Sequence, residues 1–251
     1  MNLLEHLTES ERLAYLSRQE RPLPARRSPV RPFLPQSGGR IRLIAEYKRS
    51  SPSHGAFPRQ ELPDVVRRYT AGGAAAVSIL VAQEGFAGHL EDLQAARVST
   101  DLPLLYKGFV SETGQLDEAY AFGADAVLLI AAVLGAKLAT FIARALRLGL
   151  APLVEVHRKQ ELVEALAAGA TLVGINNRNL ATLACDPGVF LGLARTVPAG
   201  VTLVAESGYK TLADIDAAEA AGAGAVLVGE ALLEQGGALL EAFAATRAHV
   251  G

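Results

Sequence analysis

Short, continuous apolar runs alternate with longer amphipathic segments along most of the chain. From residue 41 onward there are eight such runs, and the intervals between them leave room for one helix and two loops. Because the runs are apolar throughout rather than at every second residue, we expect strands covered on both faces, as in a parallel sheet. The predicted strands cover residues 41–48, 74–81, 102–108, 125–133, 151–156, 171–177, 201–207 and 224–230.

A similar segment recurs before every second predicted strand. The four copies are AGGAAAVSIL, FGADAVLLI, AAGATLVGI and AAGAGAVLVG, and in each a glycine ends a helix just before a strand. Four repeats of a two-strand unit predict an α/β fold of the closed (β/α)8 TIM-barrel type rather than an open, doubly wound sheet. An open dinucleotide-binding sheet would also carry GxGxxG after its first strand, where this chain reads EYKRSSPSHG.

The first forty residues differ in pattern from the rest. Residues 3–19 carry apolar side chains at helical spacing, whereas residues 21–39 are rich in proline and arginine, which prevents regular structure. We therefore expect residues 1–40 to form an N-terminal helix and a linker, packed on a catalytic barrel domain of residues 41–251.

Composition excludes several classes of protein. Half of the 251 residues are hydrophobic and the formal net charge is −2, so nothing favours binding to nucleic acid or to an anionic membrane. The single cysteine, Cys185, excludes an internal disulfide and a multi-cysteine metal cluster. The first residues lack the apolar segment of a secretory signal, and no run approaches the roughly 20 apolar residues of a membrane span. We expect a cytoplasmic protein.

Polar residues gather where the predicted strands end. In a TIM barrel the functional groups lie at the carboxyl ends of the strands, so these side chains should converge on one rim. The candidates are Glu46, Lys48, Lys107, Glu155, His157, Asn176, Arg178, Glu206, Ser207, Gly229 and Glu230.

Lysine usage singles out two of these positions. The chain has 24 basic residues, of which five are lysines, and Lys48 and Lys107 both lie at strand ends. A desolvated lysine can lose or donate a proton, whereas arginine effectively cannot. Both lysines are therefore candidates for acid chemistry or for a compact charge against an anion.

The loops after the last two strands suit a phosphate group. Backbone amides of Gly208 and Gly229, followed by the helix start GEALLEQ, could bind its oxygens, and Ser51 could add a hydroxyl. Glu230 is an acid beside this anion site, so its side chain must point away, or the phosphate assignment is wrong.

Five motifs carry a family resemblance. The segments IAEYKRSSPSHG, LVEVH, GINNRNL, AESGY and VGEALL, in this order, resemble indole-3-glycerol phosphate synthase of tryptophan biosynthesis. The resemblance extends from about residue 41 to the C-terminus. It implies a carbon-carbon carboxy-lyase that converts 1-(2-carboxyphenylamino)-1-deoxyribulose 5-phosphate to indole-3-glycerol phosphate, with loss of carbon dioxide and water. No cofactor and no metal is implied.

The resemblance also implies roles for the candidate residues. Lys107 would be the general acid and Glu155 the general base, with Phe86 against the anthranilate ring. Orientation of the substrate and stabilisation of charge would come from Glu46, Lys48 and Asn176, completed by Arg178, Glu206 and Ser207. The partner implied is a phosphorylated small molecule. We expect a monomer, with other tryptophan-pathway enzymes as candidate partners.

Two strand ends depart from the family pattern. Family members usually carry Arg-Lys-Asp-Phe where this chain has Tyr106-Lys107-Gly108-Phe109, and Leu-Thr-Glu where it has Leu80-Val81-Ala82. The family's Phe-Gly-Gly-Ser is replaced by Phe86-Ala87-Gly88-His89. Lysine is retained, but the loss of its charged neighbours removes a positioning hydrogen bond and a loop anchor.

Three other functions remain open. Phosphoribosylanthranilate isomerase is a related barrel that uses a cysteine at a strand end, whereas Cys185 follows the sixth strand's loop. A metal hydrolase could use Glu46, Glu155, His157 and Glu206, but nearby lysines would compete for the carboxylates. A diverged or non-catalytic barrel could bind another phosphorylated, sugar-like ligand.

Overall fold

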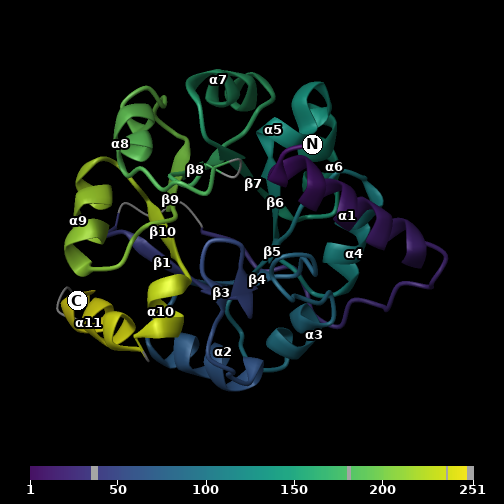
Figure 1. The fold of residues 1–251 in the computed structure, drawn as a ribbon, viewed down its shortest axis with the longest axis horizontal. Helices are drawn as coiled ribbons and strands as arrows, with labels where there is room; N and C mark the ends of the chain where they lie inside the picture. Colours follow the sequence, from purple (N-terminus) through teal and green to yellow (C-terminus); the bar gives the residue numbers. More distant parts are fainter. Residues whose placement is uncertain (35–38, 180–181, 236, 248–251) are drawn as a thin grey trace.

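Eight parallel strands form a closed barrel surrounded by helices (Figure 1), within the residues that the computed structural model describes, 1–34, 39–179, 182–235 and 237–247. The predicted TIM barrel is confirmed. Each strand pairs with the next in the chain, and the last pairs with the first, so that Arg42 lies beside Ala225. The strands are β1 Arg42–Tyr47, β4 Ala76–Leu80, β5 Leu104–Lys107, β6 Ala126–Ile130, β7 Ala151–Val156, β8 Leu172–Asn176, β9 Thr202–Glu206 and β10 Ala225–Val228.

Alternate residues of the strands belong to two separate hydrophobic clusters. Ile44, Leu105 and Leu153 fill the barrel interior, whereas their neighbours, such as Leu104 and Val154, pack beneath the surrounding helices. Burial on both faces explains why the strands have continuous apolar sequences. The polar residues that end the strands therefore emerge at one rim.

Helices connect the strands on the outside of the barrel. The repeat glycines that end them, Gly73, Gly123, Gly169 and Gly222, have positive φ, as a helix C-terminus favours. No helix in the described ranges is long and apolar enough to cross a membrane. The helices are α2 Leu62–Ala71, α3 Asp92–Arg97, α4 Gly114–Ala121, α5 Ala131–Leu134, the 3-10 helix Gly135–Lys137, α6 Leu138–Arg147, α7 Lys159–Ala167, α8 Gly188–Ala194, α9 Leu212–Ala220, α10 Glu230–Glu234 and α11 Ala238–Arg247.

The structure corrects two predicted strand ends and adds a hairpin. The predicted strand 125–133 ends at Ile130, and its last residues begin helix α5, because alanine favours helix over strand. The predicted strand 224–230 ends at Val228, and Glu230 is the first residue of α10. A short hairpin of β2 Ser50–Ser51 and β3 Gly55–Ala56, which the sequence pattern did not predict, follows β1.

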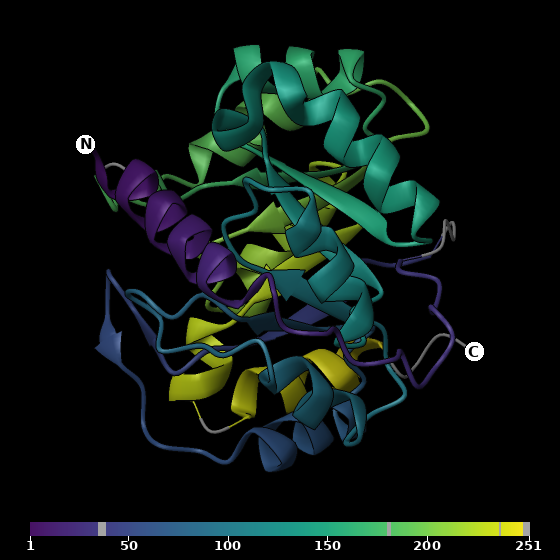
Figure 2. The ribbon, with the colours of Figure 1, turned by 90° about the vertical axis from the view of Figure 1, so that its right-hand side faces the viewer.

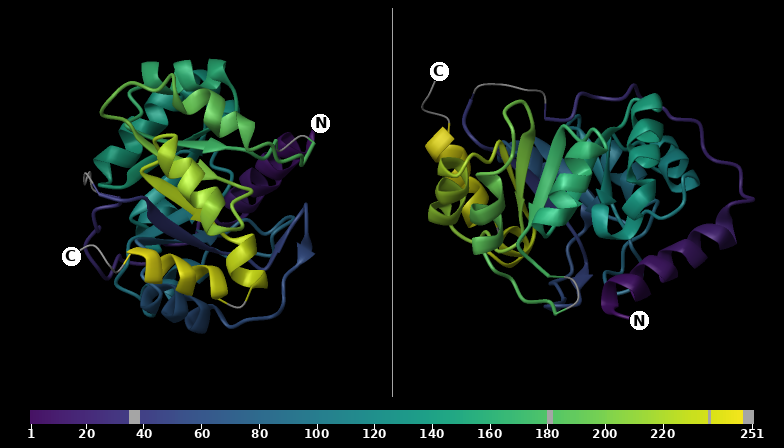
Figure 3. Two further views of the ribbon diagram at one scale, coloured as in Figure 1. Left: turned by 90° about the vertical axis from the view of Figure 1, so that its left-hand side faces the viewer. Right: turned by 90° about the horizontal axis from the view of Figure 1, so that it is seen from above.

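The N-terminal segment contacts both ends of the barrel. Helix α1 (Leu3–Arg18) begins with a capping box and lies at the same end as the β2–β3 hairpin (Figures 2 and 3). Its Leu7 is buried against the rim, and Phe33 and Leu34 of the linker belong to the same interior cluster. Residues 35–38 of the predicted linker and 248–251 of the predicted barrel domain lie outside the described residues.

Candidate active site

Lys107 lies at the centre of a buried charge cluster at the carboxyl ends of the strands. Its Nζ is 3.0 Å from Glu46 Oε2 on β1 and 3.1 Å from Glu206 Oε2 on β9. Lys48 Nζ lies 3.1 Å from the other oxygen of Glu46. The ends of three strands therefore hold two amino groups and two carboxyl groups in contact.

Burial and neighbouring charges separate the proton affinities of this cluster. Burial would raise the pKa of Glu46, but Lys107 and Lys48 outweigh it and lower the pKa to about 2. Burial dominates at Glu206 and raises its pKa to about 7. Burial would lower the pKa of Lys107, yet Glu46, Glu206 and Glu155 raise it above its usual value. Near neutrality the site thus holds a charged lysine beside a carboxyl group that can carry a proton.

Glu155 and Asn176 are the other two predicted catalytic residues at the ends of the strands. Glu155, on β7, is 2% exposed, and its Oε1 accepts no hydrogen bond from the described residues. Asn176, on β8, accepts a 2.9 Å hydrogen bond from the backbone N–H of Arg178, which holds the start of the β8–α8 loop. A buried carboxylate with a free oxygen is suited to accept a proton from a ligand.

The cluster opens into one cavity with an apolar wall. Phe86 and Phe109 lie on this wall, with ring centroids 6.0 Å apart. Ser51, only 5% exposed, reaches the same cavity from the hairpin. The other apolar side chains that line the cavity are Leu3, Leu7, Pro52, Leu80, Leu128, Ile130 and Leu183. An aromatic ring could therefore be bound beside the charged groups.

The proposed anion site adjoins the same charge cluster, in another cavity that shares Lys107, Arg178 and Ser207 with the first. Arg178, Ser207, Gly208 and Gly229 line one cavity together with Lys107. Glu230 lines it as well, so the expectation that its side chain points away is wrong. Its carboxylate lies 3.4 Å from Arg178 Nη2 and 3.4 Å from Lys210 Nζ. These two cations attract the Glu230 carboxylate into the cavity.

The structure brings all the predicted site residues to this rim, and it adds several that the sequence analysis missed. Asn177 donates to the Ser207 carbonyl at 3.1 Å and to the Tyr209 hydroxyl at 3.1 Å, which holds the β9 loop. Its place in GINNRNL was a signal that could have identified it, although Leu180 of that motif lies outside the described residues. Leu3 and Leu7 carried no such signal, because their contact with the rim depends on where α1 packs.

The departures at β4 and β5 pack against one another. Tyr106 is fully buried, and its hydroxyl has no hydrogen-bond partner among the described residues. A Cβ at Gly108 would lie 3.1 Å from Tyr106 Cε1 and 3.1 Å from Val81 Cγ2. Ala82 is buried, whereas His89 is exposed. Three of the changes thus form one packed unit behind Lys107, in which the missing side chain of Gly108 makes room for the tyrosine ring.

Comparison with known proteins identifies the family. The model of the family described as indole-3-glycerol phosphate synthase matches residues 4–241. The indole-3-glycerol phosphate synthase of Micrococcus luteus is 48% identical over 200 residues, covering 78% of this chain and 74% of that protein. The one from Parafrankia sp. is 49% identical over 199 residues, with coverage of 78% and 74%.

One solved structure shows the fold without close sequence similarity. It is the N-acetylmannosamine-6-phosphate 2-epimerase from Clostridium perfringens, with a TM-score of 0.61 and 16% identity, covering 78% of this chain and 89% of that one. The family match and the two relatives are far more specific. The chain belongs to the indole-3-glycerol phosphate synthase family.

Proposed function

We propose that this protein is an indole-3-glycerol phosphate synthase, a carbon-carbon carboxy-lyase that closes the indole ring of 1-(2-carboxyphenylamino)-1-deoxyribulose 5-phosphate. The observation that carries the proposal is the position of Lys107. Its ammonium group is held between Glu46 and Glu206, and Lys107 lines both the cavity with the apolar wall and the cavity of the anion site. An aryl ring and a phosphate at the two ends of one substrate match these two cavities.

Lys107 and Glu155 take the two proton-transfer roles in the reaction. The ring carbon that bears the carboxylate attacks the ribulose carbonyl, and Lys107 donates a proton to the oxygen as the new carbon–carbon bond forms. Carbon dioxide then leaves with its bonding electrons retained by the ring. Glu155 removes a proton from the ring-closed intermediate, while Lys107, reprotonated by Glu206, donates the proton with which the hydroxyl leaves as water, and this completes the indole. Glu206, with a pKa of about 7, can return a proton to Lys107.

The remaining candidates bind and orient the substrate. Glu46, Lys48 and Asn176 fix the reacting groups and balance their charge, while Phe86 contacts the anthranilate ring. The phosphate is bound by the groups at the loops after β8, β9 and β10, which are Arg178, Ser207, Gly208 and Gly229. Ser51, the fifth predicted phosphate group, lines the cavity with the apolar wall instead. When the phosphate binds, Arg178 and Lys210 exchange their contacts with Glu230 for contacts with the phosphate. Both contacts with Glu230 are 3.4 Å, so they are weak enough to be replaced.

The proposal includes the setting of the enzyme. Residues 41–251 are the catalytic domain, and residues 1–40 are an extension packed on it, as the buried Leu7 and Phe33 support. We propose a cytoplasmic monomer in tryptophan biosynthesis, which needs no cofactor or metal and binds neither nucleic acid nor membrane. Other enzymes of the pathway are its candidate partners.

Formation of indole provides a direct assay. The chain contains no tryptophan, so indole fluorescence reports the product with little protein background. We expect turnover by the purified protein, a loss of at least about 10³-fold in Lys107→Met, and the same thermal unfolding for both. Lys107→Arg is the matched control that keeps the charge but cannot act as the acid. A folded wild type without turnover would disprove the enzyme assignment, whereas an active Lys107→Met would disprove only the acid assignment.

A further inference from the structure

Three side chains form a line that leads away from the catalytic cavity. Glu155 Oε1 lies 3.5 Å from His157 Nε2, and His157 Nδ1 lies 3.6 Å from Glu161 Oε2. Both distances are slightly longer than a hydrogen bond, as is common for catalytic contacts before a substrate tightens them. Neither Glu155 Oε1 nor His157 Nε2 has another hydrogen-bond partner among the described residues, and both atoms are buried. Glu155 Oε1 and His157 Nε2 are therefore free to form a hydrogen bond with each other.

Glu161 is fixed as an anion on the far side of the imidazole. It accepts a 2.7 Å hydrogen bond from the His157 backbone N–H and a 2.8 Å hydrogen bond from Arg158 Nε. Burial would raise its pKa, but His157 and Arg158 outweigh burial and lower it to about 2. An anion beside Nδ1 keeps that nitrogen protonated, so the proton that His157 exchanges with Glu155 is the one on Nε2.

His157 lines a second cavity that adjoins the catalytic cavity, since Asn176 lines both. Glu155 lines the first, whereas His157, Arg158 and Glu161 line the second, which has a volume of about 750 Å³. The other charged groups around His157 are Glu206 on β9, whose charge acts on the imidazole, and Glu5, Glu9 and Asp186, which line the second cavity. Burial would lower the pKa of His157, but the carboxylates of Glu161, Glu155 and Glu206 raise it above its usual value.

We propose that His157 is the outlet for the proton that Glu155 removes from the substrate. The proton passes from Glu155 Oε1 to Nε2, and the imidazolium that forms is stabilised by the Glu161 carboxylate. It then leaves to solvent in the second cavity, so that Glu155 is again a carboxylate and no other reactant is consumed. His157 acts through Glu155 and is a positioning residue. The inference rests on the proposed function, because it takes Glu155 as the base.

A rescue experiment tests the outlet. We expect His157→Asn to lower kcat at least tenfold with KM changed less than twofold, because the base still forms but is regenerated slowly. Free imidazole, which the second cavity can admit, should restore kcat in proportion to its concentration. His6→Asn is the matched control, since His6 also lies beside a carboxylate, Glu84 at 3.9 Å, but is half exposed on α1. An unchanged kcat, or a loss that imidazole does not restore, would overturn the outlet.

A titration of the His157 ring by nitrogen NMR tests the same contact without turnover. We expect its pKa to fall in both Glu161→Gln and Glu155→Gln, because each removes a carboxylate that faces one ring nitrogen. A His157 pKa that does not respond to Glu155→Gln would overturn the proton connection. This measurement stays informative if His157→Asn fails to fold. The titration also separates the proposed function from the proton outlet. A wild type without turnover would disprove the proposed function, and the titration would still test the contact between Glu155 and His157.

Discussion

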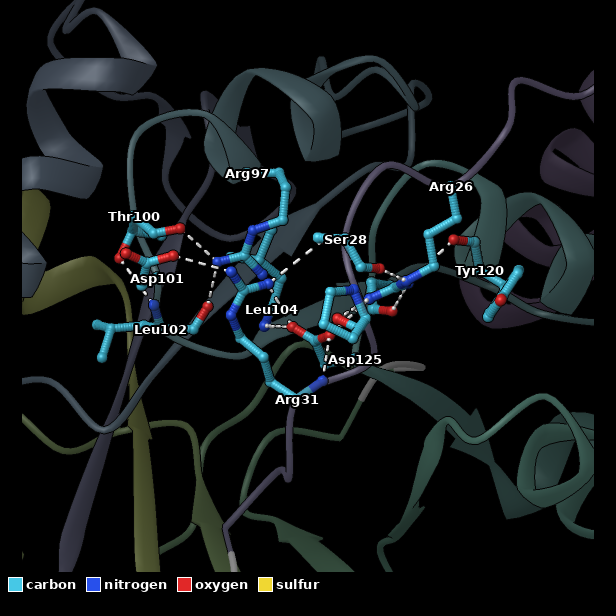
Figure 4. Close-up of polar contacts among 12 residues, drawn as sticks. Arg26, Ser28, Arg31, Arg97, Thr100, Asp101, Leu102, Leu104, Tyr120 and Asp125 are labelled. Carbon is cyan, nitrogen blue, oxygen red and sulfur yellow. Dashed lines mark hydrogen bonds and ion pairs between the residues drawn. The ribbon is translucent and has the colours of Figure 1, made fainter.

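Two buried carboxylate clusters occupy opposite ends of the barrel, and they differ in how completely their hydrogen bonds are satisfied. At the amino ends of the strands, Asp125 is fully buried (Figure 4). Its Oδ1 accepts from Arg26 Nη2 at 2.7 Å and from the Arg31 backbone at 2.9 Å. Its Oδ2 accepts from Arg97 Nη1 and from the Leu104 backbone, both at 2.9 Å. Each oxygen of the Asp125 carboxylate thus accepts two hydrogen bonds.

The cluster at the carboxyl ends leaves acceptors unused. Glu155 Oε1 and Glu206 Oε1 are buried and accept no hydrogen bond from the described residues. Unused carboxylate oxygens cost stability unless a ligand satisfies them, which suits a functional site. At the amino ends both Asp125 oxygens are satisfied, although Arg97 Nε has no hydrogen-bond partner among the described residues. The cluster of Asp125 with Arg26, Arg31 and Arg97, which we call the clamp, therefore stabilises the fold and attaches the linker to the barrel. The cluster around Lys107 is instead arranged for a substrate.

Removal of Asp125 should have the largest effect on stability. We expect Asp125→Ala to lower the free energy of unfolding by about 3–5 kcal/mol, because it leaves the guanidinium groups of Arg26 and Arg97 buried without a counter-charge. Urea unfolding measures this loss, and kcat at low temperature should change less than twofold. Asp101→Ala is the matched control, since Asp101 also pairs with an arginine, Arg31, but is fully exposed. It should leave the free energy of unfolding nearly unchanged, and equal losses in the two variants would contradict a special role for the clamp.

Glu206→Gln should show the opposite pattern, with loss of activity and a gain in stability at high pH. Burial raises the pKa of Glu206 from 4.5 to about 7, so its neutral form is favoured in the folded protein. The stability that this provides is complete below pH 4.5 and is lost as pH rises through 7. Glutamine mimics the neutral form and does not titrate. Relative to the wild type, the variant should therefore gain on the order of 2–3 kcal/mol between pH 5 and pH 8.

Urea unfolding at the two pH values checks this gain, and the indole assay checks the loss of activity. A variant whose stability follows that of the wild type at both pH values would show that Glu206 does not carry the extra proton. The crossed outcome of the two experiments, stability lost at Asp125 and gained at Glu206, would establish the difference between the clusters.

The sequence predicted the site at the carboxyl ends better than the clamp at the other end. Polar residues that interrupt apolar runs, such as Lys107 in LPLLYKGFV, mark strand ends locally, and a barrel brings all strand ends to one rim. Asp125 stood at the start of such a run, where nothing distinguished it from a solvated residue. Its partner Arg26 is 99 residues away in the sequence, so no local pattern could connect the two.

Local pattern also failed where neighbours in space decide the outcome. Ala131 was assigned to a strand because apolar residues suit both helix and strand, and the structure makes it helical. Glu230 was expected to turn away from an anion site, but the sequence could not show that Arg178 and Lys210 converge on it. The contact of Leu7 with the rim depends on the packing of α1, which helical periodicity alone does not specify.

A side chain added at Gly108 should have a smaller effect on the free energy of unfolding. Gly108 packs against Tyr106, whose hydroxyl is a third buried polar group. The Tyr106 hydroxyl is also unsatisfied, but it belongs to the packed unit behind Lys107. We expect Gly108→Ala to cost about 1–2 kcal/mol, because its Cβ would lie 3.1 Å from both Tyr106 and Val81. In a Val81→Ala background the cost should shrink, since the neighbour then gives way. Additive losses by urea unfolding in the double variant would contradict the packed unit.

Glu230→Gln should give the smallest effect, and on binding rather than on stability. The hydrogen bonds of Asp125 are short and fully buried, whereas Glu230 makes two 3.4 Å contacts and its side chain is 21% exposed. We therefore expect the variant to unfold within about 0.5 kcal/mol of the wild type. Because Arg178 and Lys210 no longer have a competing anion, KM should fall about two- to fivefold and inhibition by inorganic phosphate should strengthen by the same factor. Glu234→Gln, on the same helix but paired with His54 at 3.1 Å, is the matched control and should change neither quantity. If KM and phosphate inhibition are unchanged in Glu230→Gln, then Arg178 and Lys210 do not bind the phosphate, and the anion site must be assigned to other groups.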